Sequence, residues 1–106
     1  MIKKNDKIFV AGHNGLVGSA VIKKFKENNF TNIITVNRNK LNLFNQIKVN
    51  NFIKKNKPKM VILAAAKVGG IKANNKYRAD FIRENLQIQL NIIHSCHVNN
   101  INNLIF

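Results

Sequence analysis

Three glycines spaced three residues apart, Gly12, Gly15 and Gly18, follow a short apolar run and precede an apolar, helix-compatible segment. This order of strand, glycine turn and helix is the context that a dinucleotide-binding fingerprint requires. The first glycine permits a tight reversal of the chain, the second leaves room for a pyrophosphate, and the third lets the helix pack closely on the sheet. A purely structural turn is the alternative interpretation, but the helix start directly after the turn favours nucleotide binding.

The rest of the chain alternates between patterns typical of strands and of helices. Strands are expected at residues 8–11, 33–36, 60–64 and 101–106, and helices at residues 16–28, around 47–53 and at 77–98. A length of 106 residues suits one small domain. We therefore predict an α/β fold, a Rossmann-like three-layer αβα arrangement with an incomplete parallel sheet. Residues 1–106 would form the N-terminal part, in the order βαβαβαβ, of a doubly wound NAD(P)-binding domain.

The chain is strongly basic, with a formal net charge of +14. A basic face is one signature of nucleic-acid binding. The lysines are scattered, however, and no aromatic residues alternate with them as a stacking platform for bases requires. Solvated lysines on outer helix faces and in connecting loops explain the charge better, so we do not expect a nucleic-acid partner.

No feature of the sequence indicates a membrane or an oxidising compartment. No apolar stretch approaches the length that crosses a bilayer, and the N-terminus leads straight into the first strand without a signal peptide. Cys96 is the only cysteine, which excludes an internal disulfide and is typical of a reducing compartment. We therefore expect a cytoplasmic protein with no membrane partner.

Arg38 follows the second predicted strand, at the position that meets the adenosine ribose in dinucleotide folds. An acidic residue there binds the free 2′-hydroxyl of NAD, whereas an arginine accommodates the 2′-phosphate of NADP. Because Arg38 has no acidic neighbour, we favour NADP(H), with a solvated loop arginine as the alternative. Asn42, a few residues on, either hydrogen-bonds the adenine edge or closes a local turn.

The third predicted strand ends in three small residues, Ala64, Ala65 and Ala66. Ligands of open parallel sheets lie just beyond the carboxyl ends of the strands, so these alanines leave space for a cofactor against the backbone. Lys67 comes next, and it either contacts phosphate or is solvated. The pair Gly69 and Gly70 permits an unusual loop path beside the nicotinamide or the substrate.

The residue stretches assembled so far resemble the GDP-L-fucose synthase family of extended short-chain dehydrogenases/reductases. The resemblance is carried by residues 11–20, 41–43, 63–71, 73–75, 79–82, Asn85 and 91–94, and the run from Leu63 to Ile71 is its most distinctive part. It implies an NADP(H)-dependent enzyme that epimerises GDP-4-keto-6-deoxy-mannose at C3 and C5 and reduces it at C4. It also implies a homodimer for the full-length protein. The cofactor-binding residues that it implies are Gly12, His13, Asn14, Gly15, Leu16, Val17, Gly18, Arg38, Leu41, Asn42, Leu43, Ala64, Ala65 and Ala66.

Two positions depart from the family pattern. Asn14 stands where the family usually has an arginine that helps to bind the 2′-phosphate, and Asn45 replaces the usual acidic residue at the end of the adenine turn. The same family uses a serine and a Tyr-x-x-x-Lys pair for hydride transfer. Tyr77 is followed four residues later by Phe81 rather than by a lysine, so it does not form such a pair. We assign no catalytic residue in this chain and expect no turnover from it alone.

The histidines and the cysteine invite two further assignments. Cys96 beside His97 could act as an acid and base, but neighbours on a helix point about 100° apart, and a buried thiol with a surface imidazole is the favoured interpretation. His94 and His97 could share a metal, but no third ligand stands nearby, so we predict no metal site. Two alternative functions stay open: a nucleotide-binding module of another NAD-dependent sugar-nucleotide epimerase/dehydratase, and a basic nucleic-acid-binding fragment.

Overall fold

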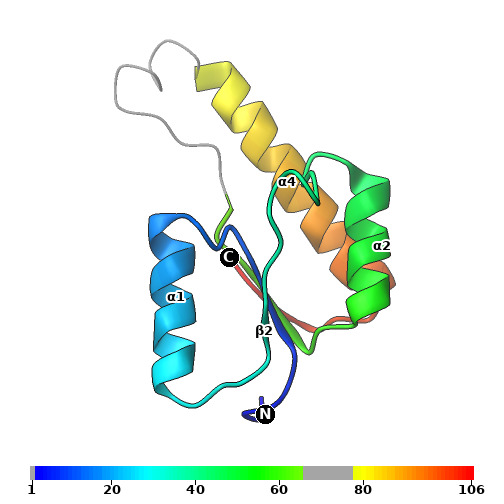
Figure 1. Ribbon diagram of the computed structural model, residues 1–106. Coiled ribbons are helices and arrows are strands. Elements are labelled where there is room, and N and C mark those ends of the chain that lie inside the picture. The colour runs from blue at the N-terminus through cyan, green and yellow to red at the C-terminus, as the bar shows by residue number, and fades with distance from the viewer. Residues whose placement is uncertain (1, 66–77) are drawn as a thin grey trace.

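The computed structural model describes residues 2–65 and 78–106, which form a four-stranded parallel sheet with helices on both faces (Figure 1). The strand order is β2-β1-β3-β4, and every neighbouring pair is parallel. Helix α1 covers one face of the sheet, and helices α2 and α4 pack side by side on the other. The three-layer parallel α/β fold predicted from the sequence is therefore confirmed. The elements are β1 (Ile8–Ala11), α1 (Leu16–Glu27), β2 (Ile33–Ile34), α2 (Gln46–Asn56), β3 (Met60–Leu63), α4 (Arg78–Val98) and β4 (Asn103–Ile105).

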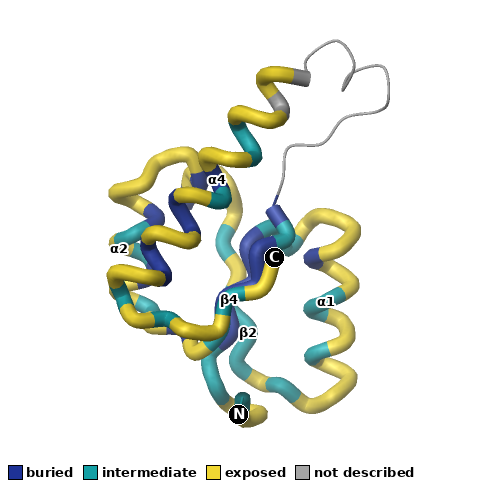
Figure 2. The backbone as a smooth tube through the Cα atoms, turned by 180° about the vertical axis from the view of Figure 1, so that it is seen from behind, coloured by how far each residue is buried: buried dark blue, intermediate teal, exposed yellow. Residues whose placement is uncertain are grey.

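The two central strands, β1 and β3, divide the hydrophobic core into two layers. Side chains alternate along a strand, so Phe9 and Ala11 of β1 face α2 and α4, whereas Ile8 and Val10 face α1. All four residues of β1 are buried, because helices cover the sheet on both sides. Figure 2 shows the same arrangement, with buried residues on the central strands and exposed residues on the outer helix faces.

The lysines of α1, of α2 and of the connection from α2 to β3 lie on these outer surfaces. The side chains are exposed on α1, on α2 and in the connection from α2 to β3, as we expected for solvated charge. They are spread over both helical layers and do not gather on one face. The exposed lysines of these three segments are Lys23, Lys24, Lys26, Lys48, Lys54, Lys55, Lys57 and Lys59.

The second strand is shorter than its sequence pattern predicts. Only Ile33 and Ile34 pair with β1, opposite Ile8 and Phe9, and the chain then leaves the sheet. β2 is an edge strand, so one neighbour alone holds it, and its β-branched sequence does not keep residues 35 and 36 in the ladder. The divergence of β2 from β1 opens the space in which the candidate site lies.

Local signals set the helix boundaries. Asn45 caps α2, because its Oδ1 accepts a hydrogen bond from the backbone N–H of Lys48 at 3.0 Å. Lys57 ends that helix in the left-handed region, with a φ of 45°, and Pro58 follows. The predicted start of the last helix at Tyr77 lies outside the described residues. No helix in the described ranges is long and apolar enough to span a bilayer.

Candidate functional site

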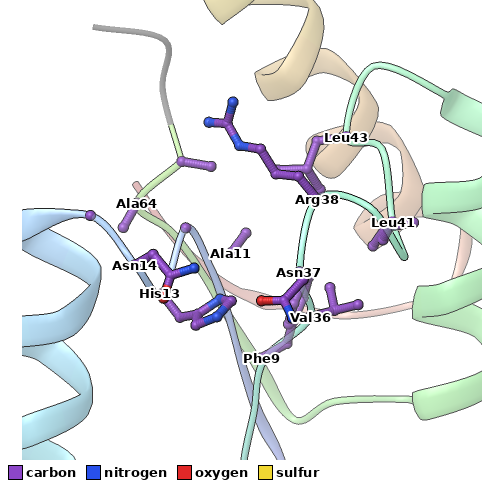
Figure 3. A pocket seen from close by; sticks show the side chains of 13 residues that line it. Phe9, Ala11, His13, Asn14, Val36, Asn37, Arg38, Leu41, Leu43 and Ala64 are labelled. Carbon is purple, nitrogen blue, oxygen red and sulfur yellow. The ribbon is translucent and has the colours of Figure 1, made fainter.

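A cavity of about 420 Å³ lies at the carboxyl ends of β1, β2 and β3. Ligands of open parallel sheets bind at this edge, where the connections on the two sides of the central strand diverge. The glycine turn, the segment after β2 and the end of β3 form its walls (Figure 3). Its lining residues are Phe9, Ala11, Gly12, His13, Asn14, Gly15, Val36, Asn37, Arg38, Leu41, Leu43, Ala64 and Ala65.

Two of the three glycines are required by the packing of the protein itself. Gly12 has a φ of +93°, and a Cβ there would lie 2.5 Å from the backbone nitrogen of Ala65. A Cβ on Gly18 would overlap the carbonyl oxygen of Gly12 and stand 2.8 Å from its carbonyl carbon. Since real Cβ atoms do not approach backbone so closely, both positions exclude any other residue without a shift of β3 or α1.

Gly15 is different, because the protein gives no steric reason for it. Its φ of −79° and ψ of 170° suit any residue, and the nearest atom to a Cβ there is the Gly12 oxygen at 3.6 Å. Gly15 is the N-cap of α1 and lines the cavity. The missing side chain therefore leaves open a cradle at the helix N-terminus, where a phosphate fits and a methyl group would intrude.

The start of α1 is electrostatically prepared for an anion. The first N–H groups of an α-helix have no intrahelical acceptor and form the positive end of its dipole. In α1 no side chain caps these groups, and the first turn contains no acidic residue. Leu16 and Val17 follow with exposed side chains, 90% and 63% accessible, and like Gly18 they are not among the residues that line the cavity.

The segment after β2 forms the opposite wall. Figure 3 shows Arg38 extending along the mouth of the cavity, while His13 and Asn14 project from the glycine turn on the other side. Arg38 is exposed and makes no ion pair within residues 2–65 and 78–106. Among the described residues that line the cavity, Arg38 is the one fixed positive charge. The 2′-phosphate role that we expect for Arg38 stays a prediction.

The loop that we expect beside the adenine is anchored in the core by two leucines. Leu41 and Leu43 are 4% and 7% exposed and line the cavity. Asn42 between them is exposed, and its Oδ1 accepts a hydrogen bond from the N–H of Phe44 at 3.0 Å. Asn42 does not line the cavity, so the structure shows the local-turn alternative for its side-chain oxygen.

Ala64 and Ala65 both line the cavity, next to the glycine turn. Their small side chains leave the floor of the site open, as their position after β3 predicted. Ala66, Lys67, Gly69 and Gly70 lie outside the described residues. Four residues that line the cavity were not predicted from the sequence as cofactor-binding residues: Phe9, Ala11, Val36 and Asn37. The signal that could have found them is the rule that sites form at the carboxyl ends of parallel strands, because each lies near the end of β1 or just after β2.

The cysteine and the histidines of α4 do not join this site. Cys96 is buried in the core between the sheet and the helices, and burial raises the pKa of its thiol from 9.0 to about 11. His94 and His97 are exposed. In the described part of the chain, no three histidine, cysteine or acidic side chains gather as a metal site requires.

Comparison with known proteins shows which family this chain resembles. The sequence model of the NAD dependent epimerase/dehydratase family matches residues 8–106. Putative GDP-L-fucose synthase 2 of Arabidopsis thaliana is 53% identical over 106 residues, which are 100% of this chain and 32% of that protein. GDP-L-fucose synthase of Escherichia coli (strain K12) is 44% identical over 100 residues, 94% of this chain and 31% of that protein.

The solved structures agree. GDP-mannoheptose C4 reductase from Campylobacter jejuni with NADP bound superposes with a TM-score of 0.91 at 41% identity, over 98% of this chain and 33% of the other. GDP-D-glycero-L-gluco-heptose synthase from the same organism, in the presence of NADPH, has a TM-score of 0.92 at 41% identity, with 98% and 30% covered. The chain spans about a third of the length of these relatives. With a family match over nearly its whole length and a glycine cradle at the edge of a parallel sheet, the chain belongs to the NAD dependent epimerase/dehydratase family.

Proposed function

We propose that this chain is the NADP(H)-binding part of a sugar-nucleotide epimerase/reductase of the GDP-L-fucose synthase type. The observation that carries the proposal is the open cradle at Gly15, which no packing contact of the protein explains, facing Arg38 across one cavity. The identities of 53% and 44% to GDP-L-fucose synthases support the choice of this enzyme type within the family.

Three parts of the cavity would hold three parts of the cofactor. The backbone N–H groups from Gly12 to Gly18 would bind the pyrophosphate, and Arg38 would bind the 2′-phosphate. Leu41 and Leu43 would pack against the adenine side, with Ala64, Ala65 and Ala66 lining the floor. NADPH, when bound, supplies the hydride for the reduction, and the contribution of this chain is to hold and orient it.

The substrate that we propose is a GDP-linked 4-keto-6-deoxy sugar, GDP-4-keto-6-deoxy-mannose. Epimerisation at C3 and C5 and reduction at C4 would convert it to GDP-L-fucose. We infer that residues 1–106 correspond to the N-terminal part of the Rossmann domain, since they match about a third of each relative. No catalytic role is assigned to the residues of this chain, so we expect that it binds the cofactor and does not by itself turn over substrate.

A titration of the 106-residue chain with NADPH tests the proposal. Binding would be followed by the change in NADPH fluorescence, with NADH as the matched ligand that lacks the 2′-phosphate. We expect saturable binding of NADPH and binding of NADH that is about ten-fold weaker, because one charge-assisted contact is lost. Absence of any NADPH binding, together with a salt-sensitive complex with DNA or RNA, would contradict the proposal and support the nucleic-acid alternative.

We further propose that the full-length protein is a cytoplasmic homodimer. Apolar side chains recur along the exposed face of α4, opposite the buried face that packs on α2 and the sheet. Exposed apolar side chains that recur at helical intervals are typical of a helix face that contacts another protein, and they support a subunit contact at α4. Sedimentation of the full-length protein tests the proposal, with a monomer at micromolar concentration as the contradicting result. The exposed residues are Ile82, Leu86, Leu90 and Ile93.

A further inference from the structure

The side chain of Asn91 connects α4 to the wall of the cofactor cavity. Asn91 is 1% exposed, and its Nδ2 donates a hydrogen bond to the carbonyl oxygen of Leu43 at 2.7 Å. These residues lie 48 positions apart in the sequence. The Oδ1 of Asn91 accepts a hydrogen bond from Nε2 of Gln87 at 2.8 Å, so both ends of the buried amide are used.

The Leu43 carbonyl belongs to the loop that runs from the end of β2 to the start of α2. This loop holds itself together by local bonds: the N–H of Leu41 donates to Asn37 O at 2.9 Å, and the N–H of Phe44 donates to Oδ1 of Asn42 at 3.0 Å. Local bonds of this kind fix the shape of a turn without fixing its place relative to the sheet. The Asn91 bond is a polar contact from another layer of the fold to this loop.

Burial of an amide at this position of α4 costs free energy, because the amide must be removed from water. Ile88 and Ile92 beside it are apolar and buried, and a leucine at position 91 would gain burial without a hydrogen-bond requirement. The amide is useful here because it donates to a carbonyl that would otherwise lose its partner. Leu43 lines the cavity, so the geometry that this bond holds is the geometry of the cavity wall.

We propose that Asn91 is a positioning residue for cofactor binding, which sets the adenosine side of the cavity through Leu43 without touching the ligand. This proposal rests on the proposed NADP(H)-binding function. In the free protein, loss of the bond lets the loop move so that the Leu43 carbonyl reaches water. Binding must then draw the loop back, so affinity falls for every ligand that carries the adenosine half.

Two variants separate this role from ordinary helix packing. In Asn91→Asp an ionised carboxylate can still accept from Gln87 but cannot donate to Leu43, and it adds the cost of a charge in the core. In Asn91→Leu an apolar side chain of similar size fills the same space, and both hydrogen bonds of the amide are lost. Asn99→Leu is the matched control, because Asn99 is a part-buried amide directly after the end of α4. Its Nδ2 bonds Oδ1 of Asn50 in α2 and the Ser95 oxygen, both at 2.8 Å, away from the loop.

The measurement is the dissociation constant of the 106-residue chain for NADPH and for 2′,5′-ADP, the adenosine half of the cofactor, beside the melting temperature. We expect both Asn91 variants to bind both ligands about 5- to 50-fold more weakly, and the control to stay within about two-fold of wild type. Faster amide exchange at Leu41 and Phe44 should accompany the loss. Wild-type affinity for 2′,5′-ADP in the two Asn91 variants would overturn the proposal, whatever their melting temperatures.

The outcomes distinguish this inference from the function on which it rests. If the wild-type chain binds neither NADPH nor 2′,5′-ADP, the proposed function fails and the positioning role falls with it. If both variants fail to fold, the positioning role is tested in the wild-type chain. The measurement is then the hydrogen-exchange rate of the Asn91 side-chain amide protons, with and without 2′,5′-ADP. We expect 2′,5′-ADP to slow this exchange at least about five-fold, and an unchanged rate would overturn the proposal.

Discussion

Replacement of Gly15 by alanine should affect cofactor binding and leave the stability of the fold nearly unchanged. The added methyl would stand 3.6 Å from the nearest protein atom, and the backbone angles at Gly15 are open to alanine. Alanine is a poorer N-cap than glycine by up to about 1 kcal/mol. The same change lowers the entropy of the unfolded chain and stabilises the fold by about 0.4–1 kcal/mol. The free energy of unfolding should therefore change by less than about 1 kcal/mol.

Cofactor binding should respond strongly to the same change. The methyl would occupy the cradle where the helix N-terminus meets the cavity, so the pyrophosphate could no longer approach the backbone N–H groups. Loss of one hydrogen bond to a charged group is worth about 1.5–3 kcal/mol. At 1.4 kcal/mol for each factor of ten, NADPH affinity should fall about 10- to 150-fold.

Gly18→Ala is the contrasting variant, because a methyl at that position would overlap the backbone of Gly12. Backbone cannot rotate away, so α1 must shift, at a cost of about 3 kcal/mol or more. We expect a melting temperature lower by more than about 10 °C, against less than about 8 °C for Gly15→Ala. Thermal melts and NADPH fluorescence titrations measure both effects. A Gly15→Ala chain that binds NADPH within three-fold of wild type would refute our assignment of the cradle.

Further variants test the charge and the buried thiol. Arg38→Gln should weaken NADPH binding about ten-fold and leave NADH binding unchanged; an equal loss for both would place Arg38 away from the 2′-phosphate. Asn14→Arg adds a cation across the cavity and should strengthen NADPH binding about three- to ten-fold in low salt, an effect that 0.5 M salt should largely remove. Burial holds the pKa of Cys96 at about 11, above its value of 9.0 in the unfolded chain. Stability from the neutral thiol is thus full below pH 9 and is lost as the pH rises towards 11, by up to about 3 kcal/mol in urea melts. Cys96→Ala should lack this loss, and an identical alkaline decline in the variant would contradict the assignment.

The sequence by itself determined the layered α/β fold, the parallel sheet and the turn that starts the site. These features depend on signals within a few residues: apolar periodicity, the uninterrupted apolar strand at Val61, and glycines where the backbone must reverse. The cap at Asn45 is a signal of the same local kind, since an N-cap bond spans only three residues.

The tertiary structure alone decided which atoms surround each glycine. The sequence pattern predicted space for a ligand at Gly15 and close packing at Gly18, and the structure supplies the distances to Ala65 and to the Gly12 carbonyl that leave no room for a Cβ at Gly12 and Gly18. The bond between Asn91 and Leu43 was also beyond sequence reasoning. Contacts between distant segments depend on how helices settle on the sheet, and this packing is set by all the layers together rather than by any local pattern.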